Sequence, residues 1–120
     1  MNQEDQELVA VFDWIRAAQG RFPELELAFH VENERHCTPQ QGAWRQRKGV
    51  RAGVPDILID VARCGYHGLR VELKVGKNTT TDTQRKWIAA LERNGYCARV
   101  CYGAEAAVST IRDYMEGRLK

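Results

Sequence analysis

The sequence lacks the features that mark several large classes of protein. It contains no run of about 18 apolar residues, so no transmembrane helix and no membrane partner are expected. Its first residues, MNQEDQELVAV, are acidic and hold no hydrophobic stretch of the signal-peptide kind. No internal repeat and no low-complexity tract is present. We therefore expect a single soluble domain over residues 1–120, located in the cytoplasm.

Motifs for other common chemistries are also missing. No glycine-rich phosphate loop of the Walker type occurs, and no Gly-x-Ser-x-Gly nucleophile motif occurs. The three histidines have no metal-motif spacing, and the four cysteines form no zinc-like pair of pairs. Free thiols are expected in a cytosolic protein. Cys97 and Cys101 lie four residues apart in an expected strand, which gives them the same face and a core-filling role.

The segment from residue 53 to residue 75, GVPDILIDVARCGYHGLRVELKV, carries the strongest pattern in the chain. Both of its halves alternate between apolar and polar or charged residues, which is typical of strands with one buried face. A turn-like segment with two glycines joins them and predicts a hairpin. The apolar faces belong to the core, and the opposite faces carry Asp56, Leu58 and Asp60 in the first strand and Arg70, Glu72 and Lys74 in the second.

The register of this hairpin decides which charged side chains meet. If Val61 lies opposite Leu69, then Asp56 lies opposite Lys74, and Glu72 is a diagonal neighbour of Asp56 on the same face. Such neighbours are roughly 7–8 Å apart, which allows two carboxylates to bind one hydrated divalent cation beside the lysine. At the other end of the hairpin, Asp60 and Arg70 are expected to form a simple ion pair.

The rest of the chain predicts helices on both sides of this hairpin. Apolar spacing predicts helices over residues 3–19 and 104–117, and strands over residues 26–32 and 96–102. Pro39 is suited to begin a short helix through Arg47, in which Trp44 is either an anchor on the core, the interpretation we favour, or a stacking surface for a base. Thr81 and Gln84 form a capping box for a helix that runs to about Asn94. The predicted fold is α/β, with helices around a mixed four-stranded sheet and a right-handed crossover from residue 69 to residue 102.

The ordered set GVPD, a glycine-flanked turn, ELK and Thr-x-x-Gln resembles the VRR-NUC branch of the PD-(D/E)XK nuclease superfamily. The resemblance covers nearly the whole chain and is closest to the small stand-alone members found in phages and prophages. It implies a restriction-endonuclease-like core and a divalent-metal-dependent endodeoxyribonuclease. For a phage-encoded protein, the expected location is the host cytoplasm.

The resemblance also implies a site. Asp56 and Glu72 are the expected ligands of Mg²⁺ or Mn²⁺, which prefer oxygen, and the family adds the Leu73 backbone carbonyl. Lys74 would position or deprotonate the attacking water and offset charge in the transition state. Gln84 is expected near the site, where it touches phosphate, caps its helix, or does both.

A glutamate near the start of the first helix points at the metal in this family. Glu4 and Glu7 are both candidates, and we favour Glu4, although Leu8 stands where the family commonly has glutamine. The alternative is that both acids only stabilise the helix N-terminus through its dipole.

Positive charge gathers just before the Pro-Asp strand, although the net charge of the chain is only +2. This basic cluster consists of Arg45, Arg47, Lys48 and Arg51. Together with Lys74 and Lys77 after the second strand, it is suited to contact a phosphate backbone. Asn33, with His30, resembles a His-x-x-Asn segment of the phage proteins, where a polar side chain orients a phosphate or a water or holds the loop.

Together these patterns predict a Mg²⁺- or Mn²⁺-dependent endonuclease for branched DNA such as four-way junctions. The alternative is a non-catalytic nucleic-acid-binding module that keeps the nuclease fold. A homodimer is expected, because paired sites could cut two strands and the terminal helices carry more apolar side chains than one face needs. If not at an interface, these side chains complete the core of the chain itself. They are Trp14, Ile111, Tyr114, Met115 and Leu119.

Overall fold

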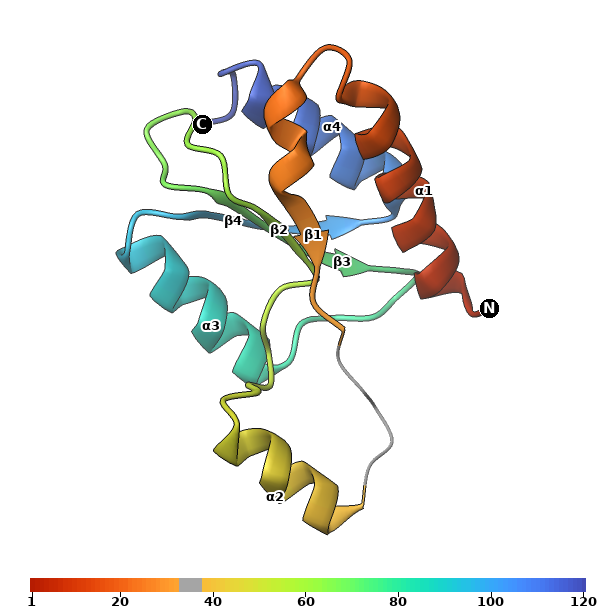
Figure 1. The fold of residues 1–120 in the computed structure, drawn as a ribbon, viewed down its shortest axis with the longest axis vertical. Coiled ribbons are helices and arrows are strands. Elements are labelled where there is room, and N and C mark those ends of the chain that lie inside the picture. Colours follow the sequence, from red (N-terminus) through yellow and green to blue (C-terminus); the bar gives the residue numbers. More distant parts are fainter. Residues whose placement is uncertain (33–37) are drawn as a thin grey trace.

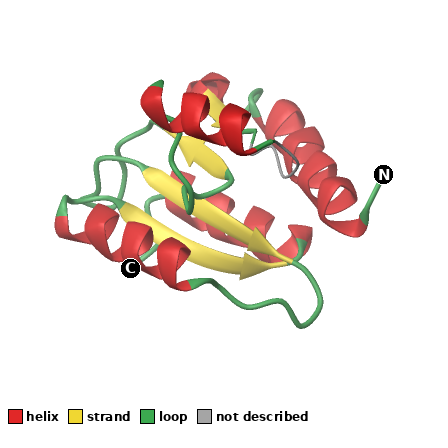
Figure 2. Cartoon of the chain, turned by 90° about the horizontal axis from the view of Figure 1, so that it is seen from below, coloured by secondary structure: helices red, strands yellow, loops and turns green. Residues whose placement is uncertain are grey.

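A computed structural model of the chain describes residues 1–32 and 38–120. Four strands form one mixed sheet in the order β1-β2-β3-β4, as the α/β prediction requires. The strands are β1 (Ala28–His30), β2 (Ile57–Ile59), β3 (Leu69–Lys74) and β4 (Cys97–Tyr102). The first three are antiparallel neighbours, whereas β3 and β4 run side by side in the same direction (Figure 2).

Helices cover both faces of this sheet. Helices α1 (Gln3–Ala18) and α4 (Ala104–Met115) lie on one side, and α3 (Asp82–Arg93), which connects β3 to β4, lies on the other (Figure 1). A further helix, α2 (Pro39–Arg47), stands apart from the sheet (Figure 1). No helix in the described part of the chain is long and apolar enough to cross a membrane.

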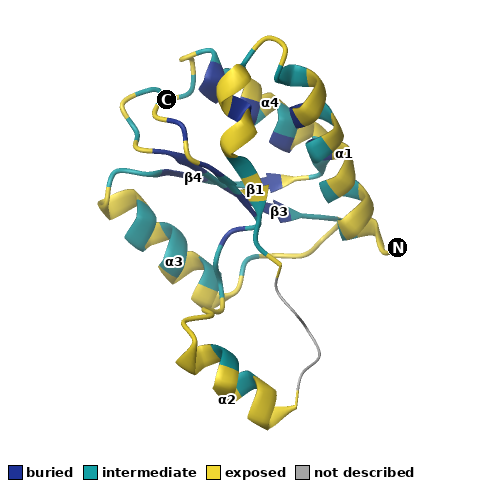
Figure 3. Ribbon diagram, in the orientation of Figure 1, coloured by how far each residue is buried: buried dark blue, intermediate teal, exposed yellow. Residues whose placement is uncertain are grey.

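The core lies between the sheet and the pair α1 and α4. Alternate residues of β3, namely Leu69, Val71 and Leu73, are almost fully buried there. Cys97 and Cys101 lie opposite Leu69 and Leu73 in the parallel ladder and are buried with them as free thiols, as their spacing predicted. The buried colour in Figure 3 follows the sheet and the inner sides of α1 and α4.

Helix boundaries agree closely with the sequence patterns. The Asn2 side chain accepts a hydrogen bond from the Asp5 amide and begins α1. Thr81 and Gln84 form the predicted capping box of α3. The prediction failed at residues 26–32, where the strand is limited to β1 and a 3-10 helix over Pro23–Leu27 precedes it. Pro23 opens that helix and Leu25 is buried in the core, so the apolar side chain is buried without a strand.

The hairpin register is shifted by two residues from the one we considered. Ile59, not Val61, lies opposite Leu69, and Leu58 lies opposite Arg70. A shift of two leaves every side chain on its predicted face, because strand side chains alternate with period two. The predicted ion pair is present, with Arg70 Nη1 3.1 Å from Asp60 Oδ1.

Two expectations about apolar side chains were wrong. Trp44 does not anchor α2 on the core: it is 57% exposed, and α2 has no buried residue. The apolar side chains offered as a dimer interface instead complete the core of the chain itself. Ile111, Tyr114 and Met115 are buried, and Trp14 and Leu119 are partly buried against the core. Helix α4 uses more than one face because it contacts α1, β3 and β4.

Candidate active site

Asp56 lies immediately before β2, at the end of the loop that leads from α2. Extending the register of Ile57 and Val71 by one residue sets Asp56 opposite Glu72. Asp56 Oδ2 accepts a hydrogen bond of 2.8 Å from the Leu73 amide, so the carboxylate is held against β3. The loop before it is fixed by Gly53, whose positive φ of 87° brings it so near Thr83 that a Cβ would lie 2.7 Å from that side chain.

Glu72 is the one buried charged side chain among the described residues, with 4% of its surface exposed. Lys74 Nζ lies 3.5 Å from Glu72 Oε2, and the lysine side chain is itself only 12% exposed. Burial raises the pKa of Glu72 to about 8, the Asp56 carboxylate raises it in the same direction, and Lys74 lowers it. Two carboxyl groups thus share a poorly solvated position with one ammonium group.

Gln84 connects this pair to the start of α3. Its Oε1 accepts a hydrogen bond of 2.9 Å from the Thr81 amide, which completes the capping box. Its Nε2 donates a hydrogen bond of 3.1 Å to Glu72 Oε2. One side chain therefore caps α3 and orients the buried glutamate. The two expectations for Gln84, a helix cap and a place near the site, are compatible.

His30 makes a contact that the sequence patterns did not reveal. Its Nδ1 lies 2.7 Å from the Asp56 carbonyl oxygen, and a carbonyl only accepts, so the imidazole donates. The Val31 amide donates to the same oxygen at 3.3 Å. The only sequence signal for His30 was the resemblance of its segment to a His-x-x-Asn motif. That resemblance suggested a role in orienting a phosphate or holding a loop, and it gave no link to Asp56. His30 fixes the main chain of Asp56.

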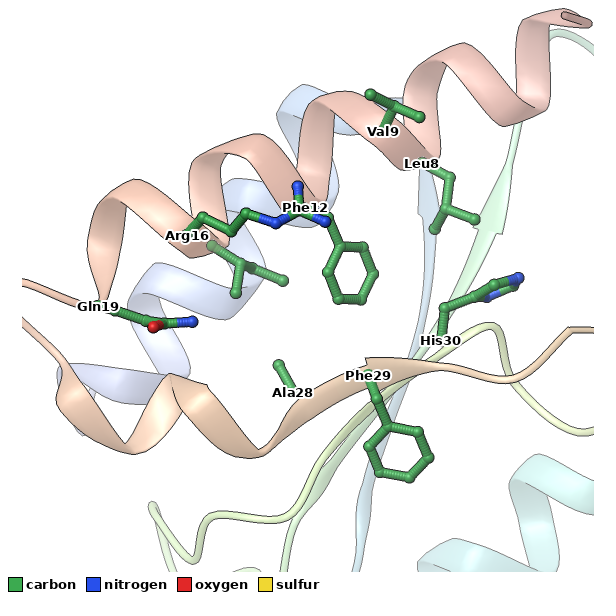
Figure 4. A pocket seen from close by; sticks show the side chains of 9 residues that line it. Leu8, Val9, Phe12, Arg16, Gln19, Ala28, Phe29 and His30 are labelled. Carbon is green, nitrogen blue, oxygen red and sulfur yellow. The ribbon is translucent and has the colours of Figure 1, made fainter.

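His30 also lines a groove between α1 and β1 (Figure 4). The groove has a volume of about 480 Å³, and Leu8 and Phe12 line its α1 side. Leu8, at the position where the resembled family commonly has glutamine, packs against the apolar core and lines this groove.

The two N-terminal glutamates lie at the end of α1 that approaches the tip of β3 (Figure 1). Glu7 Oε1 is so near Gly103 that a Cβ there would lie 3.4 Å from it, and the Gly103 amide donates to the Lys74 carbonyl. Glu4 is half-buried. Within residues 1–32 and 38–120, however, no group of three acidic, histidine or cysteine side chains is arranged to hold a metal. The choice between Glu4 and Glu7 therefore stays a prediction.

The basic cluster of Arg45, Arg47, Lys48 and Arg51 occupies the end of α2 and the loop that follows. This loop continues through Gly53 to Asp56, so the cluster is joined directly to the carboxylate site. Lys77 is exposed in the loop after β3. Asn33, the remaining predicted contact to nucleic acid, lies outside the described residues.

Comparisons with known proteins identify the family of the chain. The sequence profile of the VRR-NUC domain matches residues 2–105. A solved structure described as a VRR_NUC domain protein superposes with a TM-score of 0.82 at 33% sequence identity, covering 98% of this chain and 91% of that one. No curated protein matches. The chain belongs to the VRR-NUC domain family, a nuclease-type family.

Proposed function

We propose that the protein is a divalent-metal-dependent endonuclease that hydrolyses phosphodiester bonds in DNA. The observation that carries this proposal is the contact of Glu72 with both Lys74 and Gln84, beside an Asp56 carboxylate held by the Leu73 amide. This is the residue set of the Pro-Asp and Glu-x-Lys motifs, which supports membership of the PD-(D/E)XK superfamily.

The residues present fit a bound Mg²⁺ or Mn²⁺. Burial raises the pKa of Glu72 to about 8, the neighbouring Asp56 carboxylate adds to this rise, and a bound divalent cation would stabilise both carboxylates in their charged form. Magnesium sites commonly use one or two carboxylates and retain several waters, so a third acidic side chain is not required. Asp56 and Glu72 would hold the ion, with the Leu73 carbonyl as the further ligand that the family implies.

When bound, such an ion neutralises charge on the phosphate and activates a water for attack. The chain supplies the remaining functions. Lys74 positions or deprotonates that water and offsets charge that develops on the phosphate. Gln84 keeps Glu72 oriented through its Nε2, and His30 keeps the main chain of Asp56 in place.

Nucleic-acid binding is supported by the position of the basic cluster. Its four positive side chains precede Asp56 in the chain, and Lys77 follows Lys74 by three residues. A phosphate backbone that contacts both sets would pass the carboxylate pair. The chain as a whole is nearly neutral, so attraction to DNA depends on this local concentration of charge.

We further propose selectivity for branched DNA, such as four-way junctions, by a homodimer of the phage or prophage type acting in the host cytoplasm. A single small domain has little surface to recognise a branched substrate, and a two-fold dimer would present two sites for two strands. Exposed apolar side chains available for such contacts include Val9 and Phe29, which line the groove between α1 and β1, and Leu27, which immediately precedes β1.

The test is cleavage of a panel of labelled substrates with Mg²⁺, with Mn²⁺ and with EDTA. The panel holds blunt duplex, flap, splayed-arm and four-way-junction DNA. Endonuclease activity predicts metal-dependent cuts that are most efficient on a branched member. Tight binding to the panel without cleavage under any metal condition would contradict the enzyme and identify a non-catalytic nucleic-acid-binding module.

A further inference from the structure

Helix α2 is stabilised at its ends rather than by burial. At its start, the Thr38 side chain accepts from the Gln41 amide and the Gln41 side chain accepts from the Thr38 amide. At its end, the Val50 and Gly49 amides donate to the Arg45 and Gln46 carbonyls, with Gly49 at a positive φ of 95°. This is a Schellman motif, which closes a helix through its own backbone. A nine-residue helix without a buried residue is thus held in shape by its caps.

The side chains that α2 presents combine one large aromatic ring with positive charge. Trp44 is 57% exposed, and the Arg47 guanidinium lies 5.4 Å from the centre of its ring. Residues three apart share a helix face, so Arg47 steadies the ring and stays beside it. More than half of the Trp44 surface is open to solvent, which leaves the ring available to stack on a ligand. The charges that surround this ring, from Arg45 to Arg51, favour a polyanion as that ligand.

The position of α2 connects this ring to the carboxylate pair. Figure 3 shows α2 exposed on nearly all sides and set apart from the sheet. Its C-terminal end continues into the loop that Gly53 packs against Thr83 at the start of α3. The chain reaches Asp56 three residues after Gly53, so a short segment connects α2 to the carboxylate site.

We propose that Trp44 is a base-stacking residue that binds an unpaired base of the DNA substrate, while the basic cluster contacts the phosphates on either side. This inference rests on the proposed function and names the substrate feature that the protein recognises. Stacking on an aromatic ring is available to an unpaired base but not to the same base inside a duplex. The relevant substrate is therefore DNA with single-stranded nucleotides next to the cleaved bond, such as a flap, a splayed arm or an opened junction.

The experiment measures binding without cleavage, so it does not depend on nuclease activity. The full chain with Asp56→Asn is titrated in EDTA against a splayed-arm DNA and against the matching blunt duplex. Each DNA carries 2-aminopurine, unpaired in the first and paired in the second. In this background, Trp44→Ala should weaken splayed-arm binding about tenfold, change duplex binding less than twofold, and remove the quenching of 2-aminopurine.

Two further variants separate stacking from loss of structure. Trp44→Phe should keep most of the splayed-arm affinity and the quenching, because a phenyl ring also stacks. Gln46→Ala, on the same exposed helix, should change neither value. Equal weakening on both DNAs, or quenching that persists in Trp44→Ala, would overturn the proposal. So would a change in sedimentation alone, which would assign Trp44 to a protein contact. A protein that passes this test but never cleaves would refute the proposed nuclease activity and not the stacking.

Discussion

Asp56 is fixed by groups from three elements. His30 and Val31 hold its carbonyl from the β1 side, the Leu73 amide holds its carboxylate from β3, and Gly53 packs the preceding loop on α3. A metal ligand that is held at its main chain and its side chain loses little freedom when a cation binds. These supports explain how a residue at the end of a three-residue strand can be placed accurately.

Lys74 should act on turnover more than on DNA binding. Its ammonium lies beside Glu72, and its side chain is only 12% exposed, so we expect it to act at the reacting phosphate more than in docking the DNA. We expect Lys74→Ala to lower kcat by roughly 10²–10³-fold, comparable with loss of one group that stabilises transition-state charge. Dissociation constants in EDTA and single-turnover rates separate the two effects.

Lys77→Ala is the matched control, since it removes the same charge from the exposed loop after β3. It should weaken binding modestly and leave the rate of the bound complex unchanged. Equal losses of affinity and turnover in Lys74→Ala would make Lys74 a phosphate contact.

Glu72 should make the stability of the metal-free protein dependent on pH. Its pKa is raised from 4.5 to about 8, so the folded protein binds this proton more tightly than the unfolded chain. The resulting stability is complete below pH 4.5 and is lost as the pH rises through about 8. In EDTA, the Tm of the wild type relative to Glu72→Gln should therefore fall across this range.

Addition of Mg²⁺ at pH 8 should raise the Tm of the wild type, because a bound ion compensates the negative charge that Glu72 gains when it loses its proton. It should leave the Tm of Glu72→Gln nearly unchanged. A difference in Tm that stays constant with pH would mean that Glu72 is charged over the whole pH range and that the Asp56 carboxylate does not disfavour its charged form.

Among the elements, we propose that the end of α2 and the loop that follows it contact the DNA. Replacing Arg47 and Lys48 with alanine should flatten the slope of log affinity against log salt by about two units, since each phosphate contact contributes roughly one. Arg112→Ala with Arg118→Ala removes the same charge from α4 and the turn after it, and it should leave the slope unchanged. If both pairs behave alike, the DNA does not follow the basic cluster.

Most elements could be predicted from the sequence because their signals are local. Caps and apolar spacing define α1, α3 and α4 within a few residues. The hairpin register could not be predicted, because faces alternate with period two and registers that differ by two residues bury the same side chains. The turn between β2 and β3 sets the register: Cys64 and Gly65 both have positive φ, Arg63 pairs with Tyr66, and one extra residue is accommodated between the end of β2 and Arg63.

The candidate site was predictable to the extent that its residues are close in sequence or part of a known motif. Asp56, Glu72, Lys74 and Gln84 fall in this class. The role of His30 depends on the pairing of β1 with β2, which no local pattern determines. The exposure of Trp44 had a signal that could have been used: α2 carries no other large apolar residue, so it has no apolar stripe to bury.

At the scale of the whole molecule, the dimer proposal now depends on symmetry and on the exposed side chains near β1, because the terminal helices bury theirs within the chain. Sedimentation equilibrium at micromolar concentration should give twice the chain mass of 13.7 kDa. Phe29 is 44% exposed on the edge strand, so Phe29→Glu should shift the equilibrium toward the monomer. A 13.7 kDa species that still cuts both strands of a junction would refute the dimer.

Asp56 and Glu72 are proposed to hold the ion on which the nuclease activity depends. The most direct measurement is Mg²⁺-dependent cleavage of the preferred branched DNA by Asp56→Asn and Glu72→Gln, each compared with the wild type and checked for folding by circular dichroism. Each variant removes one charge and keeps the shape of the side chain. We expect both variants to fold and to show no detectable cleavage, and substantial Mg²⁺-dependent cleavage by both would contradict the assignment of Asp56 and Glu72.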